Sequence, residues 1–515
     1  MRQPASDLLH LAVGMSSTER LSTLAVGGML VLLWSVAGWA GWSLLGLYSD
    51  AAYYLTEILA KGGFDAFDDP QRLFMIAASQ VPVVIALKLG LTDLKWLVPI
   101  YSFTLLAVPA LFYSLALLHA RHDEDLLGWV VGAIALVFLP SCLFSIGEYN
   151  MPYAAIVLAA TYLASPRALS AREDAVLLLT AVFLLRAYEM MLFLGPLLAA
   201  LAIRRLPPET LQGAEAWRQR SPRLFYFAVM AFPVGLAVCV YQARIGFPVA
   251  AIAAAIAMVA ATRARPGLLS RRSGIVLIVV AALFLAGAVI AASSPRLTSG
   301  ASGSLGLFST SLRDSIAFPN PQLLLVTAAL AVAAVALRRN SRVLIATCAA
   351  LLVALALLPL AQLRQWPATP IGSLHYNSRL FGGLLLAAGL AILVLRGTAV
   401  GPGRRGLLAA LAASAALLPS TFFAAAEWRE AVLDLQRSLE GRSAPPALSE
   451  VPPPLQRWHI AWPADAKIAT YIATLVRTPD STARQLPQQP APTAGAGEDA
   501  PAAFDDRLSG FRWKP

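Results

Sequence analysis

The stretch LSTLAVGGMLVLLWSVAGWAGWSLLGLYSDAAYY, residues 21–54, decides the fold. Its apolar part, residues 21–47, exceeds the roughly 20 residues that an α-helix needs to cross the hydrocarbon core of a bilayer. This run is too long for the core of a signal peptide and lacks a clean small-x-small cleavage site, so we expect a helix that is retained in the membrane. The chain then turns polar at Asp50, which is followed by Tyr53 and Tyr54.

The rest of the chain repeats this apolar pattern. Hydrophobic residues make up 58% of the 515 and charged residues 13%, and the mean hydropathy is +0.66. A soluble domain carries about a quarter charged residues, so the composition excludes an ordinary soluble protein. We expect an all-α polytopic membrane protein with about 13 transmembrane helices. The predicted spans are roughly 22–47, 95–119, 126–146, 150–165, 174–186, 188–203, 223–243, 246–262, 274–292, 321–337, 343–361, 380–396 and 407–426.

The charge and the cysteines exclude several other classes. The net charge of +11 comes from short basic clusters between the apolar runs, where arginine and lysine set topology and contact lipid headgroups. We therefore expect membrane lipids as partners and no nucleic acid. Cys142, Cys239 and Cys348 all lie inside apolar runs without metal-ligand spacing, which indicates packing residues rather than a disulfide framework or a zinc site.

Residues 73–90 are ambiguous, because this apolar run is short and contains Pro82 and Lys88. If the run does not cross the bilayer, most of the arginine clusters fall on the side of the amino terminus. The positive-inside rule then favours a cytoplasmic amino terminus and an external carboxyl-terminal tail. We therefore predict that residues 73–90 form an interfacial helix within the first external loop.

The predicted organisation has four parts. Residues 1–20 form a cytoplasmic amino terminus, and residues 21–426 form the transmembrane domain, in which residues 48–94 are the first external loop. Residues 427–484 form a small external segment that starts with an amphipathic stretch. Residues 485–515 are rich in Pro, Ala and Gln at their start, and we predict disorder there.

Two acids follow predicted spans on the external side. Asp50 comes directly after the first span, where it can act as a general base at the interface or cap the helix that carries Tyr53 and Tyr54. Glu148 lies in SIGEYNMPY, where the third span ends, and faces the same side of the membrane in this topology. The alternative for Glu148 is a solvated turn residue.

Arginines near the same side are candidates for binding a phosphate. Arg186, Tyr188 and Glu189 interrupt an apolar stretch; Arg186 and Glu189 can form an ion pair on one helix face, or Arg186 can bind a phosphate or pyrophosphate. His375 and Arg379 form a polar cluster just ahead of a late span, where Arg379 either binds an anion or only reaches the interface.

The first loop carries a further charged cluster. Arg72 stands with Asp65, Asp68 and Asp69 in FDAFDDPQR, where a solvated loop is the alternative to a substrate-binding role. The carboxylates could bind a divalent metal, but their spacing matches no defined site. The sequence therefore identifies no definite cofactor and leaves a divalent metal as the candidate.

The order of these motifs resembles the GT-C glycosyltransferases, in particular the bacterial branch related to protein O-mannosyltransferases and aminoarabinose transferases. The matching stretches are SDAAYY from residue 49, QVPVVIALKLGLTDLKWLVPIYS from residue 80, GEYNMPYAAIVLAATYL from residue 147 and LLRAYEMMLFLGPLL from residue 184. The chain departs from the family pattern at Ala51, at Val83 and at Lys95, as a divergent member would.

The resemblance implies a GT-C-like fold in the bacterial inner membrane. It also implies transfer of a sugar from a polyprenyl-phosphate carrier to an envelope acceptor on the periplasmic face, with Asp50 as the base. A transporter or flippase of an envelope lipid or solute is the alternative, and a structural or assembly subunit that docks through residues 427–440 is a third. The absence of an internal repeat and the gathering of charges near one face favour the enzyme.

Overall fold

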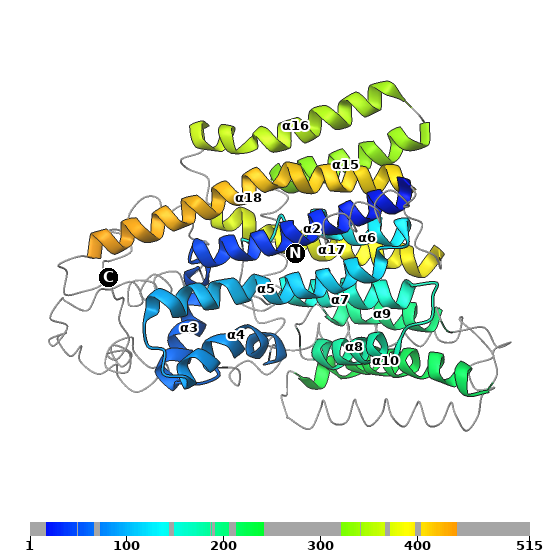
Figure 1. The fold of residues 1–515 in the computed structure, drawn as a ribbon, viewed down its shortest axis with the longest axis horizontal. Coiled ribbons are helices and arrows are strands. Elements are labelled where there is room, and N and C mark those ends of the chain that lie inside the picture. Colours follow the sequence, from blue (N-terminus) through cyan, green and yellow to red (C-terminus); the bar gives the residue numbers. More distant parts are fainter. Residues whose placement is uncertain are drawn as a thin grey trace, which may run out of the picture.

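The protein is helical throughout the residues that the structure, a computed structural model, describes (Figure 1). Those residues are 17–48, 50–65, 73–143, 149–185, 187, 191–204, 206, 213–240, 321–339, 341–365, 371–396 and 403–439. No β-strand occurs among them. The predicted spans 246–262 and 274–292 and the tail after residue 439 lie outside the described residues.

A helix occupies each predicted span that falls within the described ranges. The helices are α2 (Ser17–Trp42), α3 (Asp50–Lys61), α4 (Leu73–Lys88), α5 (Leu94–Ala120), α6 (Glu124–Ala133), α7 (Asn150–Ala164), α8 (Ala171–Leu184), α9 (Met191–Arg204), α10 (Gly213–Val240), α15 (Pro321–Arg339), α16 (Arg342–Gln365), α17 (Ile371–Arg396) and α18 (Gly403–Leu439). A 3₁₀ turn, η1 (Leu45–Leu47), follows α2, and a π-helical segment, η2 (Ile134–Phe138), continues α6.

Side-chain caps start several of these helices where the sequence turns from apolar to polar. The carboxylate of Asp93 accepts from the backbone N–H of Lys95 at 2.9 Å and opens α5, and Asp123 caps α6 in the same way. Ser170 and Glu173 form a reciprocal capping box at α8. Each cap satisfies backbone donors that the first helical turn leaves without a partner.

Three helices extend well beyond the spans predicted for them, and the first of these, α10, begins at Gly213 rather than near residue 223. α17 begins at Ile371 rather than near residue 380, so His375 and Arg379 belong to the helix and not to a loop ahead of it. α18 runs without a break to Leu439, so the predicted span 407–426 and the amphipathic stretch after it are one helix of 37 residues.

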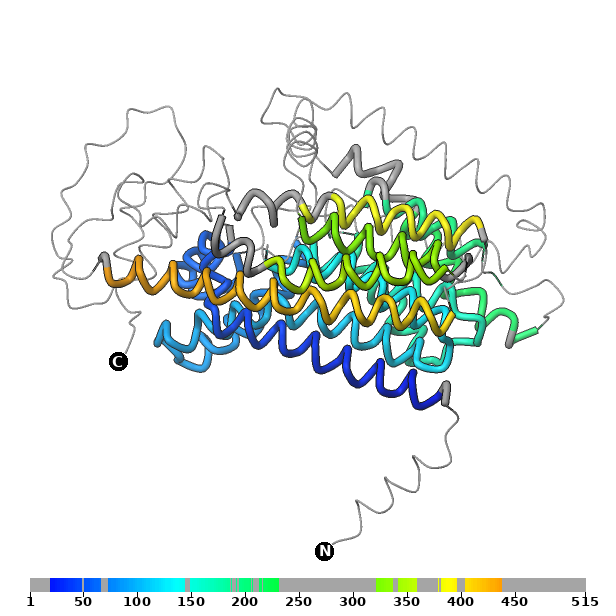
Figure 2. The backbone as a smooth tube through the Cα atoms, turned by 90° about the horizontal axis from the view of Figure 1, so that it is seen from above, coloured from blue at the N-terminus to red at the C-terminus, as the bar shows by residue number. Residues whose placement is uncertain are grey.

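α5 lies at the centre of the bundle and packs against α2, α4, α6 and α7. α18 packs between α2 on one side and the pair α15 and α16 on the other, as both views show (Figures 1 and 2). The fully buried side chains include large aromatic residues: Tyr101, Tyr113, Tyr153, Tyr226 and Trp428.

Three contacts define the two ends of the bundle. The backbone N–H of Gly46, after α2, donates to Ser102 Oγ of α5 at 2.8 Å, so α5 begins at the end where α2 stops. We call this the α3 end. At the opposite end the N–H of Gly403 donates to Asp125 Oδ1 at 3.2 Å, which joins the start of α18 to the start of α6. His119 near the end of α5 contacts Glu173 of α8 there as well.

The helices have the length and composition of a membrane protein. Among the described residues, three stretches are long and apolar enough to cross a bilayer: Glu19–Trp42, Leu94–Ala120 and Gly403–Arg437. Several shorter apolar helices pack beside them, α7 among them. Leu24, Val31 and Val343 are among the large apolar side chains exposed on the outside of the bundle, as expected where lipid covers the surface.

Candidate functional site

The corner between α2 and α3 is closely packed against α5. Leu44 adopts a left-handed conformation, with φ of 59°, which breaks the helix and turns the chain into η1. Gly46 then passes so close to α5 that a Cβ atom would lie 2.8 Å from both Ser102 Oγ and Tyr101 Cδ1. The same N–H of Gly46 is satisfied by Ser102 Oγ, so the close approach also completes a buried hydrogen bond.

Asp50 is the first residue of α3, six residues after this left-handed turn. An acid in the first helical turn is stabilised by the backbone N–H groups and the helix dipole, so this position fits both of the roles expected for it. Tyr53 and Tyr54 lie one turn further along α3, and their rings are 5.4 Å apart. Tyr54 is buried and Tyr53 is half-buried. Both of these predicted residues therefore lie in α3 close to Asp50.

A partly buried ionic cluster that the sequence did not reveal closes the other end of α3. Lys61 Nζ lies 3.2 Å from a Glu57 carboxylate oxygen and also pairs with Asp65. Asp65 is buried rather than solvated, with 3% of its surface exposed, and Glu57 is buried as well. Burial alone would lower the pKa of Lys61, but the two carboxylates raise it above its ordinary value, so the ammonium group stays charged.

Gln80 joins this cluster to α4. The backbone N–H of Asp65 donates to Gln80 Oε1 at 2.8 Å, and Gln80 Nε2 donates back to the Asp65 carbonyl at 3.1 Å. Gln80 is completely buried. A single amide thus satisfies both backbone groups of one loop residue, which ties the end of α3 to α4. In the sequence this contact shows only as one polar residue, Gln80, within an apolar run.

Glu148 lies outside the described residues, but the chain on either side of it is held at the α3 end. Ser141 Oγ lies 2.8 Å from Asn150 Oδ1, and Asn150 Nδ2 donates to the Ser141 carbonyl at 3.2 Å. Since α6 starts at the opposite end, η2 and the residues after it reach the α3 end, and α7 begins there.

Four of the remaining predicted residues are not described by the structure, and two lie in α17. Arg72, Arg186, Tyr188 and Glu189 lie outside the described residues, and for the last three the flanking helix α8 starts at the opposite end and runs toward the α3 end. His375 and Arg379 lie in the first turns of α17.

The glycines of α17 show its direction. A Cβ added at Gly383 would meet Tyr153, in the first turn of α7, whereas one added at Gly389 would meet Trp129 of α6 at 2.5 Å. α17 therefore starts toward the α3 end and runs away from it.

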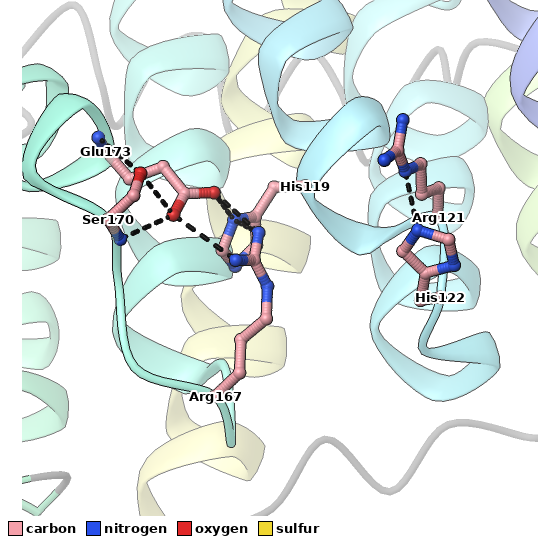
Figure 3. A network of polar contacts seen from close by, with 6 residues as sticks. All are labelled: His119, Arg121, His122, Arg167, Ser170 and Glu173. Carbon is pink, nitrogen blue, oxygen red and sulfur yellow. Dashed lines mark hydrogen bonds and ion pairs between the residues drawn. The ribbon is translucent and has the colours of Figure 1, made fainter.

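The most complete polar network among the described residues lies at the opposite end of the bundle (Figure 3). Nδ1 of His119 lies 2.7 Å from Glu173 Oε1, and Arg167 Nη2 contacts that oxygen at 2.5 Å and His119 Nδ1 at 2.8 Å. Burial alone would raise the pKa of Glu173, but hydrogen bonds from Ser170, His119 and Arg167 lower it to about 2. This network fastens α5 to the turn before α8, and it is separated from Asp50 by the length of the bundle.

A second pair beside it faces outward. Arg121 Nε donates to His122 Nε2 at 2.7 Å in the turn after α5, and both side chains are exposed (Figure 3). The pair belongs to the basic surface expected on the cytoplasmic side.

Neither a metal-ligand cluster in the described residues nor a comparison with known proteins identifies the site further. Within the described ranges no group of three His, Cys, Asp or Glu side chains is arranged to hold a metal ion. No protein-family model, curated protein or solved structure matches the chain. The candidate site therefore rests on the geometry at the α3 end, where Asp50 opens a helix behind a rigid corner.

Proposed function

We propose that the protein is a membrane glycosyltransferase of GT-C type that transfers a sugar from a polyprenyl-phosphate carrier to an envelope acceptor. The observation that carries this proposal is the position of Asp50, the first residue of α3, directly behind the corner at the end of a membrane-length helix. A carboxylate at such a place meets both a lipid-anchored donor and a water-exposed acceptor. The proposal adopts Asp50 as the general base that removes the proton of the acceptor hydroxyl.

The proposed chemistry uses arginine on the leaving group. As the acceptor oxygen bonds to the anomeric carbon, the bond to the phosphate oxygen breaks, and the polyprenyl phosphate leaves with an extra negative charge. Arg186 and Arg379 are the proposed partners of that phosphate, since a guanidinium group can bind two phosphate oxygens at once. Glu148 is proposed as a second acid beside the acceptor, and a divalent metal is an optional partner of the phosphate.

The proposal also includes an arrangement in the membrane. In this arrangement the chain crosses the bacterial inner membrane about 13 times, with the amino terminus in the cytoplasm and the carboxyl terminus in the periplasm. α3 and α4 then belong to the first periplasmic loop. The basic surface at Arg121 and Arg167 supports this orientation, because it lies at the end opposite Asp50.

The test is donor turnover by membranes that contain the protein. Polyprenyl-phosphate-linked hexoses and aminopentoses, tritium-labelled in the sugar, are supplied to these membranes, and the release of the free polyprenyl phosphate is measured. Asp50→Asn should lower the rate by about 10²- to 10⁴-fold, the usual contribution of a general base. Glu430→Gln is the matched control, because Glu430 is an exposed acid of α18 near the same end, and it should keep full activity.

Two outcomes would contradict the proposal. Full activity of Asp50→Asn would remove Asp50 as the base. Passage of an intact labelled lipid across sealed vesicles, with no cleavage of the sugar–phosphate bond, would assign the protein to transport instead.

A further inference from the structure

α18 extends past the other helices at the α3 end, as Figure 1 shows. Its 37 residues span about 55 Å at the rise of an α-helix, whereas the hydrocarbon core of a bilayer is about 30 Å thick. Its first residue is held at the opposite end by Asp125. The last turns of α18 therefore reach well beyond the corner that carries Asp50.

Trp428 packs against that corner from the far end of the sequence. The indole is 1% exposed, and its Nε1–H donates to the carbonyl oxygen of Leu44 at 3.3 Å across 384 residues of chain. The same ring meets Tyr48 edge-on, with centroids 5.1 Å apart. Trp428 thus contacts the corner on both sides of η1.

The contact is with Leu44, whose backbone has the positive φ that residues other than glycine rarely adopt. Leu44 has a left-handed backbone, a conformation that is unfavourable for a side chain with a Cβ atom and persists only where the surroundings stabilise it. The carbonyl of Leu44 accepts two hydrogen bonds, one from the backbone N–H of Leu47 at 2.9 Å within the turn and one from Trp428, which is the contact that α18 adds.

Neighbouring residues of α18 hold the last turn of α2 in place. The guanidinium carbon of Arg429 lies 4.8 Å from the ring centroid of Trp42, and the same side chain donates to the Trp42 carbonyl. Phe422, two helical turns before Arg429 and on the same face of α18, stacks on Trp42 at 6.0 Å. One face of α18 therefore contacts both the end of α2 and the turn that follows it.

We propose that Trp428 is a positioning residue, which fixes the corner at Leu44 and Tyr48 and thereby the backbone position of Asp50 at the start of α3. The inference deepens the proposed function and rests on it for the role of Asp50. In this proposal Trp428 acts through the corner and not on the substrate. Its effect passes through the corner, because only one residue separates Tyr48 from Asp50.

The first measurement is independent of any activity. Hydrogen exchange of the full-length protein in lipid nanodiscs is followed by mass spectrometry on a peptide covering residues 43–55, in which the N–H groups of Gly46, Leu47 and Tyr48 are hydrogen-bonded. Trp428→Phe keeps an aromatic ring beside Tyr48, but it removes the indole N–H donor together with part of the buried ring system. It should raise the exchange rate of this peptide about 5- to 10-fold, the factor expected when one net hydrogen bond is lost.

The controls separate a local effect from general destabilisation. A peptide covering residues 123–130, at the start of α6 and at the opposite end, should exchange as in the wild type. Trp34→Phe changes a half-exposed tryptophan of α2 that no described hydrogen bond holds, and it should leave the corner peptide unchanged. Unchanged exchange at residues 43–55 in Trp428→Phe would overturn the proposal.

The second measurement is kinetic and uses the donor assay. Trp428→Phe should lower kcat per folded molecule with little change in the KM for the donor, because a misplaced base affects the reaction more than binding. A fall only in the amount of folded protein, with kcat intact, would reduce Trp428 to a structural anchor and overturn the proposal. If the wild type turns over no donor but the corner peptide responds, the proposed function fails while the link from Trp428 to the corner stands.

Discussion

Replacing Gly46 by alanine tests the close contact on which the corner depends. The added methyl group would lie 2.8 Å from Ser102 Oγ and from Tyr101 Cδ1, and 3.2 Å from the backbone nitrogen of Ser102. Tyr101 is fully buried in the core, and Ser102 is buried too, so neither side chain can swing out into lipid. The backbone at Gly46 must therefore move away from α5.

The expected cost has three parts. Forcing a methyl group into a packed site costs about 1–3 kcal/mol. Moving Gly46 stretches the hydrogen bond from its N–H to Ser102 Oγ, now 2.8 Å, and leaves a buried donor without a partner, for about 1–3 kcal/mol more. Burial of the methyl group returns about 0.8 kcal/mol. The sum is a loss of about 3 kcal/mol, within a range of roughly 1–5.

The assay is thermal unfolding of the detergent-purified protein, followed by tryptophan fluorescence at several scan rates, because large membrane proteins often unfold irreversibly. Gly38→Ala is the matched control, since nothing lies within 4 Å of a Cβ added there on α2. This control should be neutral or gain up to about 1 kcal/mol in helix propensity. Ser102→Ala isolates the hydrogen bond. If Gly46→Ala unfolds at the same temperature as Gly38→Ala, the close contact does not support the corner.

Two further perturbations address other parts of the bundle. Gly389→Ala should cost about 1–3 kcal/mol in the same unfolding assay, because its methyl group would lie 2.5 Å from the Trp129 ring, and Gly27→Ala, with open space around it, should not. Glu173→Gln should destabilise the protein at neutral pH. Because the folded pKa of Glu173 is depressed to about 2 from an ordinary value of 4.5, wild type and variant should differ by a constant amount above pH 4.5 and converge as the pH falls toward 2.

The positions of the helices were predictable because segments inside a bilayer must be apolar and segments in water can be polar. This difference appears along the sequence as alternating apolar and polar runs. The span predicted at 95–119 corresponds to α5, Leu94–Ala120, which starts after the capping carboxylate of Asp93 and ends before Arg121. Both boundaries are visible as a change from polar to apolar residues. The span predicted at 174–186 starts three residues late, because that prediction did not use the capping-box spacing of Ser170 and Glu173, which opens α8 at Ala171.

Helix ends beyond the apolar runs were harder to predict. A polar stretch was taken to end a helix, yet α17 already includes His375 and Arg379, and α18 continues through Glu427 to Leu439. Water can solvate polar side chains on a helix that leaves the hydrocarbon, so polarity alone does not stop it. The next glycine after the α18 span is Gly441, and a helix without a breaker is expected to continue to that point.

The contacts of the candidate site were not predictable, because they depend on partners far apart in the sequence. The left-handed turn falls on Leu44, a residue type that gives no signal for it, and its partner Trp428 lies 384 residues away. Gln80 satisfies the backbone of Asp65 because α3 and α4 fold back on one another. Only the residue types were legible from the sequence, and not the surroundings that bury them.

The number of crossings between α2 and α5 decides which candidate acids share one end of the bundle. The hydrogen bond from Gly46 to Ser102, in the third turn of α5, means that α3 and α4 together return the chain to the end at which α2 stops. α5 then runs the length of the bundle, α6 and η2 bring the chain back, and Asn150 opens α7 at the α3 end. One more crossing would have placed Asn150, and the segment before it that contains Glu148, about 40 Å from Asp50, the length of a helix such as α5. Two acids can act on one substrate only at a much shorter separation, so a proposal that uses both depends on α3 and α4 making no net crossing.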